Sequence, residues 1–236
     1  MRYYISDNHF FHERIDIMDG RGFDNLHEMH EYMIHQWNQK VTNNDEVFVL
    51  GDLSFGKGIQ TWNIINRLNG KIYLVEGNHD NFYLDDPDFV DNFEDVISYG
   101  EYEDGNRKVI VCHYPIPFYN KQFSRLNDRS PMTYMLYGHL HNTYDEYLLH
   151  QSMRLCESQP RLCARGYEET TPFNMINTFC VFSDYVPLSL YEWILVDERR
   201  RKMIDDKEKE VGGRLNYQQW EELGMEIIER AKNRWK

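Results

Sequence analysis

The chain has 236 residues, of which 41% are hydrophobic and 28% are charged, and its formal net charge at pH 7 is −13. This length and composition are typical of one globular α/β domain with a sizeable core. The acidic balance disfavours nonspecific binding to long nucleic acids. The chain has no run of 18 apolar residues, so we expect no transmembrane helix and no membrane partner.

The cysteines and the N-terminal residues both favour a cytoplasmic protein. Cys112, Cys156, Cys163 and Cys180 form no C-x-x-C pair, and the first residues contain no apolar secretion signal. We therefore expect reduced thiols and a cytoplasmic location.

The first 75 residues predict an alternation of strands and helices. Apolar runs at 2–5, 46–50 and 71–75 are typical of buried strands. Apolar residues at helical spacing predict helices over 25–40 and 59–68. A capping-box pattern opens the first helix at Asn25 and Glu28, and Asn69-Gly70 is typical of a C-cap after the second. This order predicts a largely parallel sheet with right-handed crossovers.

The middle of the chain predicts further strands and one irregular segment. A helical turn over 86–93 precedes strands expected over 96–102, 108–112, 133–137 and 174–182. Asp104-Gly105-Asn106 predicts a hairpin turn, and 118–131 reads as a polar loop. We interpret 142–173 as an insertion near the functional site, which acts as a lid or selects the substrate.

Two helices are expected at the C-terminal end. Ser189 and Glu192 form a capping-box pattern that opens the first, and Gly212-Gly213 ends it. The second covers 216–235 and is amphipathic, so its apolar side either packs on the core or contacts a partner.

Polar side chains follow five of the apolar runs at their C-terminal ends. In chain order they are Asp7 and His9, Gly51-Asp52, Gly77-Asn78-His79-Asp80, His113, and Gly138-His139-Leu140-His141. A single stretch of this kind is typical of a turn in which Asn and Asp cap their own backbone. Five such stretches indicate one shared site, because ligands bind beyond the carboxyl ends of strands in α/β sheets.

The chemistry of this set predicts a metal site. The candidate ligands are Asp7, His9, Asp52, Asn78, His113, His139 and His141. They include no thiolate and suit Mn²⁺, Fe²⁺ or Zn²⁺. Seven ligands are too many for one tetrahedral zinc ion, but they suit two divalent ions about 3.5–4 Å apart with one shared carboxylate, such as Asp52. Because residues i and i+2 of an extended segment point the same way, we expect His139 and His141 to face one site.

Asp7 and His9 have the same spacing, and the same expectation applies to them. The other histidines favour different interpretations. Surface or structural roles are expected for His27, His30 and His35 on a predicted helix and for His150 in the insertion. His12 either contacts the metal ligands without binding a metal ion itself or is exposed.

Taken in order, the motifs Asp7-x-His9, Gly51-Asp52, Gly77-Asn78-His79-Asp80, His113 and Gly138-His139-x-His141 resemble the signature of the calcineurin-like metallophosphoesterases. The small bacterial and phage phosphoesterases of this superfamily are the most similar type. The resemblance covers residues 1–195 and leaves 196–236 as a C-terminal helical extension. It implies a single-domain, four-layer α/β/β/α sandwich with a dinuclear centre at the strand ends.

The resemblance also implies a role for each site residue. One metal ion would take Asp7, His9, Asp52 and His141, and the other would take Asp52, Asn78, His113 and His139. His79 would act at the leaving-group oxygen as a general acid or charge stabiliser, and Asp80 would orient His79 by a hydrogen bond. Many members carry a second acidic residue soon after the Gly-Asp pair, whereas Leu53-Ser54-Phe55 follows here.

These roles predict a metal-dependent phosphoesterase, an enzyme that hydrolyses phosphate esters, with phosphodiesters favoured. Two divalent ions, Mn²⁺ in the first place, would activate water as the nucleophile. The expected substrate is a small phosphate ester or a nucleotide. Arg14, Arg21, Arg125 and Arg129 are candidate phosphate contacts or plain surface charges. The alternatives are a nuclease acting on short nucleic acid or RNA ends, and a non-catalytic metal-binding scaffold for a protein partner.

Overall fold

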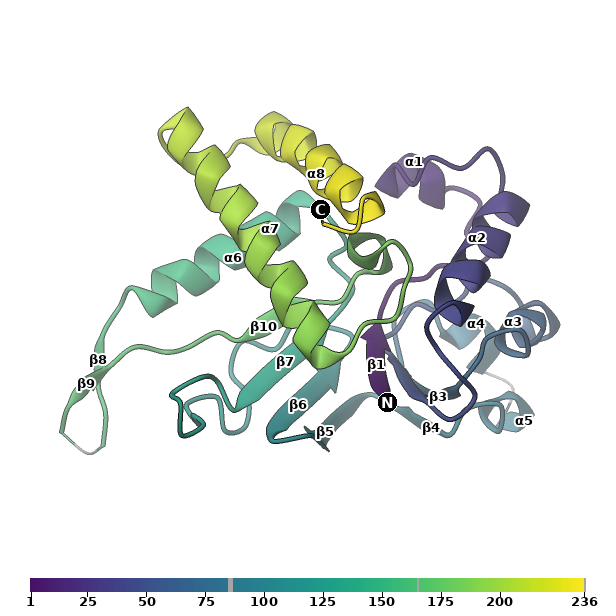
Figure 1. The fold of residues 1–236 in the computed structure, drawn as a ribbon, viewed down its shortest axis with the longest axis horizontal. Coiled ribbons are helices and arrows are strands. Elements are labelled where there is room, and N and C mark those ends of the chain that lie inside the picture. The colour runs from purple at the N-terminus through teal and green to yellow at the C-terminus, as the bar shows by residue number, and fades with distance from the viewer. Residues whose placement is uncertain (85–86, 165, 236) are drawn as a thin grey trace.

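Two four-stranded sheets form the centre of the molecule (Figure 1). The computed structural model describes residues 1–84, 87–164 and 166–235. The first sheet has the order β1-β2-β3-β4, and all of its strands are parallel. Its strands are β1 (Arg2–Ile5), β2 (Glu46–Val49), β3 (Lys71–Val75) and β4 (Asp95–Ile97). Their carboxyl ends therefore lie along one edge of the sheet, as the alternation of strands and helices predicts.

The second sheet has the order β10-β7-β6-β5 and is mixed. Its strands are β5 (Tyr99–Asp104), β6 (Arg107–Cys112), β7 (Thr133–Tyr137) and β10 (Met175–Asn177). Strands β6, β7 and β10 are parallel to one another, and β5 joins β6 through the predicted hairpin turn at Gly105. Gly105 has a φ of 62°, a backbone conformation that favours glycine in such a turn.

The two sheets meet at the end of β1. The Ser6 N–H donates to the Thr178 carbonyl (2.9 Å), and the Cys180 N–H donates back to the Ser6 carbonyl (3.0 Å). The residues after β10 form a short 3₁₀ helix, η1 (Cys180–Ser183). This junction brings the carboxyl ends of the parallel strands of both sheets close together. The candidate ligands follow those strand ends.

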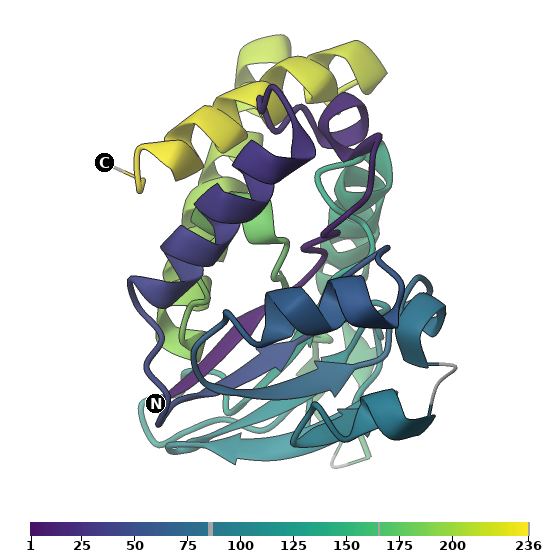
Figure 2. The ribbon, with the colours of Figure 1, turned by 90° about the vertical axis from the view of Figure 1, so that its right-hand side faces the viewer.

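Helices cover the sheets. They are α1 (Ile15–Asp19), α2 (Leu26–Asn38), α3 (Gly58–Ile65), α4 (Asn81–Leu84), α5 (Pro87–Val90), α6 (Tyr144–Glu157), α7 (Leu190–Val211) and α8 (Tyr217–Lys232). Figure 2 shows α3 running across the strands of the first sheet, with α8 at the opposite end of the molecule. Helix α7 packs along β10 and β1, and α8 lies against α7, α6 and η1. Within the described residues, no helix combines the length and the apolar character that crossing a membrane requires.

The predicted helix caps are mostly confirmed. The Asn25 side chain accepts the Glu28 N–H at the start of α2, and Ser189 forms a capping box with Glu192 at the start of α7. The predicted C-cap at Asn69-Gly70 is wrong, because α3 ends at Ile65 and Asn66 is its C-cap. Gly70 instead makes a turn with a φ of 98° beside Val41.

Two of the predicted strands are wrong in extent. The expected strand over 96–102 is two strands, since β4 pairs with β3 in one sheet and β5 pairs with β6 in the other. The chain therefore changes sheets near Ser98. The expected strand over 174–182 covers only Met175–Asn177, because the backbone then turns into η1 to reach Ser6. The expected turn over 86–93 contains α5, and Asp86 lies outside the described residues.

The expected insertion at 142–173 contains one long helix and a small hairpin. Helix α6 packs against α8, so this part belongs to the body of the fold. The hairpin of β8 (Arg161–Leu162) and β9 (Glu168–Glu169) projects from the molecule in Figure 1. The boundary expected at 195/196 falls inside α7, which continues without a break. A mixed α/β fold is confirmed, while the four-layer order stays a prediction.

Candidate metal centre

All seven candidate ligands lie in the loops that follow strand ends. Asp7 and His9 follow β1, Asp52 follows β2, and Asn78 follows β3. From the second sheet, His113 comes directly after β6, while His139 and His141 follow β7. The junction at Ser6 places these two groups of loops beside each other, so strands of both sheets contribute to one cluster.

Backbone hydrogen bonds hold the first two loops together. The N–H groups of Asp7, His9 and Phe10 donate to the carbonyls of Gly51, Asp52 and Leu53, at 2.9 to 3.0 Å. The Phe55 N–H donates back to the Phe10 carbonyl (2.8 Å). These bonds fix the separation between the side chains of Asp7 and Asp52 before any ligand binds.

The backbone of the cluster is unusual. Five candidate ligands have left-handed φ angles between 47° and 68°, namely Asp7, His9, Asp52, His139 and His141. This region costs about 1–2 kcal/mol per residue for most side chains, although Asp and His enter it more readily than others. Such strain is concentrated at functional sites. The expected extended conformation of Asp7-x-His9 and His139-x-His141 is therefore wrong.

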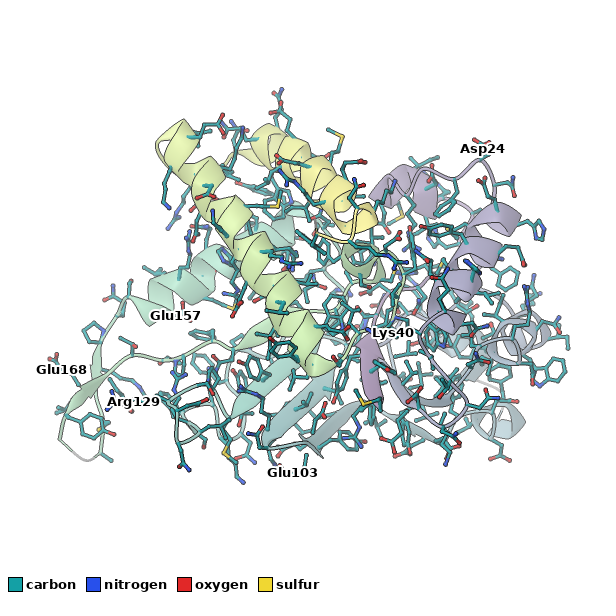
Figure 3. All side chains as sticks on the ribbon, in the orientation of Figure 1. Asp24, Lys40, Glu103, Arg129, Glu157 and Glu168 are labelled. Atoms are coloured by element: carbon teal, nitrogen blue, oxygen red, sulfur yellow. The ribbon has the colours of Figure 1, made fainter. Side chains whose placement is uncertain are left out.

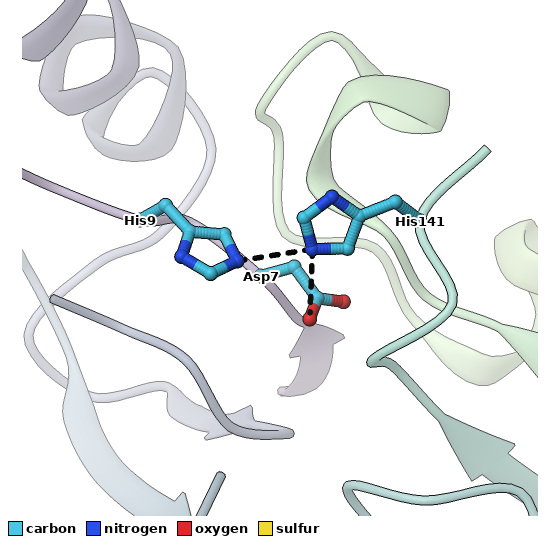
Figure 4. Close-up of side chains that lie close together, drawn as sticks. All are labelled: Asp7, His9 and His141. Carbon is cyan, nitrogen blue, oxygen red and sulfur yellow. Dashed lines mark hydrogen bonds and ion pairs between the residues drawn. The ribbon is translucent and has the colours of Figure 1, made fainter. Parts of the chain in front are cut away.

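One group of the cluster joins Asp7, His9 and His141. The Nε2 atoms of His9 and His141 lie 3.0 Å apart, and His141 Nε2 lies 3.5 Å from Asp7 Oδ1 (Figure 4). All three side chains are buried. Phe179 stacks on the His141 ring at 4.7 Å and fixes its plane.

A second group joins Asp52, Asn78 and His113. His113 Nε2 lies 2.9 Å from Asn78 Oδ1 and 3.6 Å from Asp52 Oδ2. The same Asp52 Oδ2 atom lies 3.6 Å from His9 Nε2, so this carboxylate stands between the two groups. The expectation that Asp52 is shared by two ions stays a prediction.

His139 lies at the edge of the second group. Its N–H donates to Asp7 Oδ1 (2.9 Å), and its ring centroid lies 5.1 Å from that of His113 and 4.6 Å from that of Tyr114. His139 and His141 therefore contact different parts of the cluster. The alternation of strand side chains does not apply to them, because β7 ends at Tyr137.

His79 lies beside the cluster and is half-buried. Its N–H donates to Asp52 Oδ1 (2.9 Å), and its ring packs against Phe55, with a centroid distance of 4.4 Å. Partial burial lowers the pKa of His79, so the imidazole is neutral at pH 7 and keeps one N–H donor.

Asp80 does not orient His79 through a hydrogen bond, and this expectation is wrong. In the described part of the chain the fully buried Asp80 carboxylate accepts four hydrogen bonds, from the N–H groups of Asp52, Leu53 and Gly77 and from the Tyr83 hydroxyl. Asp80 therefore ties the β2 and β3 loops together, and it acts on His79 only through its charge.

One functional residue, Asp19, escaped the sequence analysis, and the role expected for Arg21 is wrong. Asp19, at the end of α1, accepts a hydrogen bond from His141 Nδ1 (2.8 Å). Arg21 is fully buried rather than a surface charge or a phosphate contact, since it donates to Asp19 and to the carbonyls of Asp7 and Asn8. Metal-binding histidines usually donate their second N–H to a carboxylate. That rule indicates that an acidic partner exists, but many of the acidic residues in the sequence fit it equally well.

The remaining predicted residues are placed as follows. His12 lies beside the site, with its ring 4.1 Å from that of Phe55 and 5.6 Å from that of His9. His30 and His150 are buried, whereas His27 and His35 are exposed, as their helical positions allow. Arg14, Arg125 and Arg129 are exposed.

The buried carboxylates give the cluster an excess of negative charge. Burial raises the pKa of Asp52, and the neighbouring Asp7 and Asp80 raise it further against the effect of His113. Burial opposes the charged form of His141, but Asp7 and Asp19 together raise its pKa to about 10. Both shifts mean that the cluster retains protons in its centre, and a cation bound there would take their place.

The hydrogen-bond pattern fits a metal ion. His113 Nδ1 lies 2.9 Å from the Leu50 carbonyl and donates to it, which leaves Nε2 facing the Asn78 oxygen. His141 Nδ1 bonds to Asp19 in the same way, so the loss of its other proton leaves a lone pair on Nε2. His9 Nδ1 is buried and has no hydrogen-bond partner among the described residues. Once the protons retained in the centre leave, these nitrogen and oxygen lone pairs converge, and a metal ion satisfies that arrangement.

Three glycines leave the space that this arrangement needs. A Cβ atom on Gly51 would lie 2.3 Å from His113 Nδ1, and one on Gly77 would lie 2.3 Å from Asp52 Oδ1. A Cβ atom on Gly138 would lie 2.5 Å from Asp7 Oδ2. The residues present therefore fit bound divalent ions in both donor set and shape. Two sets of three side chains bring their ligand atoms within 4.8 Å of one another. One set is Asp7, His9 and His141, and the other is Asp7, Asp52 and His113.

The fold and the cluster together define a mixed α/β protein with a candidate metal centre at its strand ends. The family model of the calcineurin-like phosphoesterase superfamily domain matches residues 3–155. The chain belongs to this superfamily, which confirms the resemblance seen in its motifs. The family is metal-dependent, and the cluster described above supplies the candidate ligands.

One curated protein and two solved structures are similar to parts of this chain. The uncharacterized protein MJ1445 of Methanocaldococcus jannaschii is 34% identical over 148 residues, which cover 61% of this chain and 72% of that protein. The crystal structure of the protein of unknown function AQ665 from Aquifex aeolicus has a TM-score of 0.56 and 22% identity, covering 81% of this chain and 96% of that one. It shares the fold. A Vps29 structure from Entamoeba histolytica matches with a TM-score of 0.32 and 14% identity, over 75% of this chain and 73% of that one.

Proposed function

We propose that the protein is a metallophosphoesterase that hydrolyses phosphodiesters with two divalent metal ions. The observation that carries this proposal is the position of Asp52, whose Oδ2 atom lies 3.6 Å from the Nε2 atoms of both His9 and His113. One carboxylate between two sets of nitrogen and oxygen donors is the arrangement that a pair of ions shares. The calcineurin-like superfamily domain over residues 3–155 supports the same reaction class.

In this proposal each ion has four protein ligands. The first is held by Asp7, His9, Asp52 and His141, and the second by Asp52, Asn78, His113 and His139. Mn²⁺ is the preferred metal, and Fe²⁺ or Zn²⁺ also suit these ligands. When bound, the ions would supply Lewis-acid chemistry, lowering the pKa of water toward neutrality and neutralising charge on the phosphoryl oxygens.

The protein itself contributes a preorganised frame. Asp19 and Leu50 hold the tautomers of His141 and His113, so that each ring presents a lone pair to the centre. Arg21 and the backbone bonds between the β1 and β2 loops fix the distance between Asp7 and Asp52. Because these groups do not reorganise during the reaction, the site offers a fixed electrostatic environment for the in-line displacement at phosphorus.

His79 is the proposed catalytic residue on the leaving-group side. Its backbone is fixed by the bond to Asp52, and its ring is supported by Phe55. The neutral imidazole keeps one N–H, which donates to the ester oxygen as the bond to phosphorus breaks. Asp80 has a positioning role here, since it holds Asp52 and Gly77 in place.

A diester assay tests the proposal. Bis(p-nitrophenyl) phosphate should be hydrolysed with added Mn²⁺ and not after chelation, faster than p-nitrophenyl phosphate. Asp52→Ala should lose metal and turnover together, whereas His79→Gln should keep its metal and lose turnover by about 10²–10⁴-fold. Asp24→Asn, an exposed carboxylate, is the matched control and should behave as wild type. Metal-independent turnover, or unchanged turnover in Asp52→Ala, would refute the proposal.

A further inference from the structure

A surface rich in exposed aromatic and basic side chains leads away from the candidate metal centre. We name it the aromatic–basic surface, and it comprises Tyr114, Phe118, Lys121, Phe123, Arg125 and Arg129 of the loop after β6, with Arg161 and Tyr167 of the β8–β9 hairpin. Phe118 is 71% exposed and Phe123 is 41% exposed, and the two tyrosines are about as open to solvent as Phe123, at 46% and 51%. Clustered aromatic exposure of this kind usually marks a binding site.

Three of the four cations of this surface form no ion pair with a carboxylate among the described residues. Lys121, Arg125 and Arg129 have no ion pair among the described residues, although the chain has 39 acidic and 26 basic side chains. Arg161 pairs with Glu169 (3.2 Å) and lies over the Phe123 ring at 4.5 Å. Cations without a paired carboxylate are available to contact an anionic ligand.

The surface is continuous with the site. Tyr114 directly follows the candidate ligand His113, and its ring lies 4.6 Å from that of His139. Phe118 is four residues further along the loop, and its ring centroid lies 5.9 Å from that of Phe173. Figure 1 shows the loop between β6 and β7 and the β8–β9 hairpin at the same end of the molecule, and Figure 3 labels Arg129 and Glu168 there.

The loop is braced, so the surface is preformed. Gln122 is buried and donates to the carbonyls of Pro117 (3.0 Å) and Pro172 (2.7 Å). The Tyr119 hydroxyl accepts the Asn174 N–H (3.0 Å), which ties the loop to the start of β10. A loop that is held in place before binding lowers the entropic cost of binding a flexible chain.

From these observations we infer that the aromatic–basic surface binds single-stranded nucleic acid and delivers one of its phosphodiesters to the metal centre. Exposed aromatic rings stack on bases, and basic side chains contact the phosphates between them. The net charge of −13 opposes contact beyond this surface, so the footprint is a few nucleotides. This inference rests on the proposed function and assigns its substrate class.

The reaction is a hydrolysis that balances without another reactant. The water oxygen forms a new bond to phosphorus, and the bond from phosphorus to one sugar oxygen breaks. One water proton ends on the released sugar hydroxyl, and the other goes to solvent as the phosphate monoester ionises. Two shorter strands are the products.

The test compares an oligonucleotide with a small diester on the metal-loaded protein. The probes are fluorescein-labelled hexauridylate and hexathymidylate, and bis(p-nitrophenyl) phosphate reports the centre alone. Phe118→Ala should lower kcat/KM for the hexamers about tenfold through loss of stacking, with the small diester unchanged. Arg125→Gln should reduce the slope of log Kd against log salt by about 0.7. Tyr191→Ala, an aromatic residue that is 68% exposed on α7, is the control and should change neither.

Fluorescence anisotropy without divalent metal separates this inference from the proposed function. Hexamer binding that Phe118→Ala weakens supports the inference even if no ester is cleaved, in which case the proposed function fails alone. Turnover of the small diester without binding or cleavage of either hexamer overturns the inference and leaves the proposed function standing. Equal losses on both substrates in Phe118→Ala would also overturn it.

Discussion

The Nε2 atoms of His9 and His141 face each other at 3.0 Å in the buried centre of the protein. His141 Nδ1 already bonds to Asp19, so Nε2 is the ring nitrogen that faces His9. Because Asp7 and Asp19 raise the pKa of His141 to about 10, a proton lies between the two Nε2 atoms, and a cation bound at the centre would replace it. The arrangement makes Asp19 as informative as the ligands themselves, although it does not touch the centre.

Replacing Asp19 with Asn should weaken metal binding without removing a ligand. The amide no longer favours the His141 tautomer that directs a lone pair to the centre, and such partners typically contribute 10–100-fold in affinity. Competitive metal titration of Asp19→Asn against Asp24→Asn measures the effect. An affinity equal to that of wild type would show that Asp19 does not set the tautomer.

Replacing Gly77 with Ala should disturb both stability and metal binding. The new Cβ would lie 2.3 Å from Asp52 Oδ1 and 2.5 Å from the Asp52 nitrogen, so the β2 loop must move. Overpacking of this kind costs about 1–3 kcal/mol. Gly213→Ala is the matched control, because a Cβ there meets nothing within 4 Å, and thermal unfolding with elemental analysis compares the two variants. Full metal content in Gly77→Ala would contradict the expected shift of Asp52.

Replacing Asp80 with Asn should destabilise the fold. The amide nitrogen would face N–H groups of Asp52, Leu53 or Gly77, leaving buried donors unsatisfied at a cost of about 3 kcal/mol in the free energy of unfolding. Tyr83→Phe removes a single donor to the same carboxylate and should cost about 1 kcal/mol. Chemical denaturation gives both values. An Asp80→Asn protein that keeps wild-type stability and changes only the pH profile of turnover would restore the role of Asp80 in orienting His79.

The stability of the protein should fall with acid because of His30. Burial lowers the pKa of His30 to about 4, and its Nε2 accepts the Phe11 N–H (2.9 Å). The unfolded state binds a proton near pH 6.5 and the folded state only near pH 4, so stability rises with pH across this window. The contribution of His30 to the free energy of unfolding is fully present above pH 6.5. At pH 5 this contribution is smaller by about 2 kcal/mol.

Denaturation at pH 7 and pH 5, at one fixed metal concentration, checks this prediction. Wild type should lose about 2 kcal/mol more than His30→Gln between the two pH values. His27→Gln, on the exposed side of α2, should lose as much as wild type. Equal losses in wild type and His30→Gln would show that His30 does not titrate on unfolding.

The sequence alone brought out the candidate ligands because they follow a repeated rule. An apolar run that ends in Asp, Asn or His marks the carboxyl end of a buried strand, and parallel strands bring these ends to one edge. Asp7, Asp52 and His113 were predictable for this reason, as were the helix starts at Asn25 and Ser189, whose caps depend only on residues three positions apart.

Only the tertiary structure decided how the two sheets meet and what surrounds the ligands. The change of sheet near Ser98 has no local signal, because both halves of 96–102 have strand-like patterns and differ only in their partners. Likewise, the hydrogen bond between Asp19 and His141 joins residues that are 122 positions apart. The hydrogen bonds between Asp80 and the β2 loop join residues that are up to 28 positions apart. Local sequence predicted the helix starts and the presence of most strands, whereas contacts across such separations depend on the packing of the whole chain.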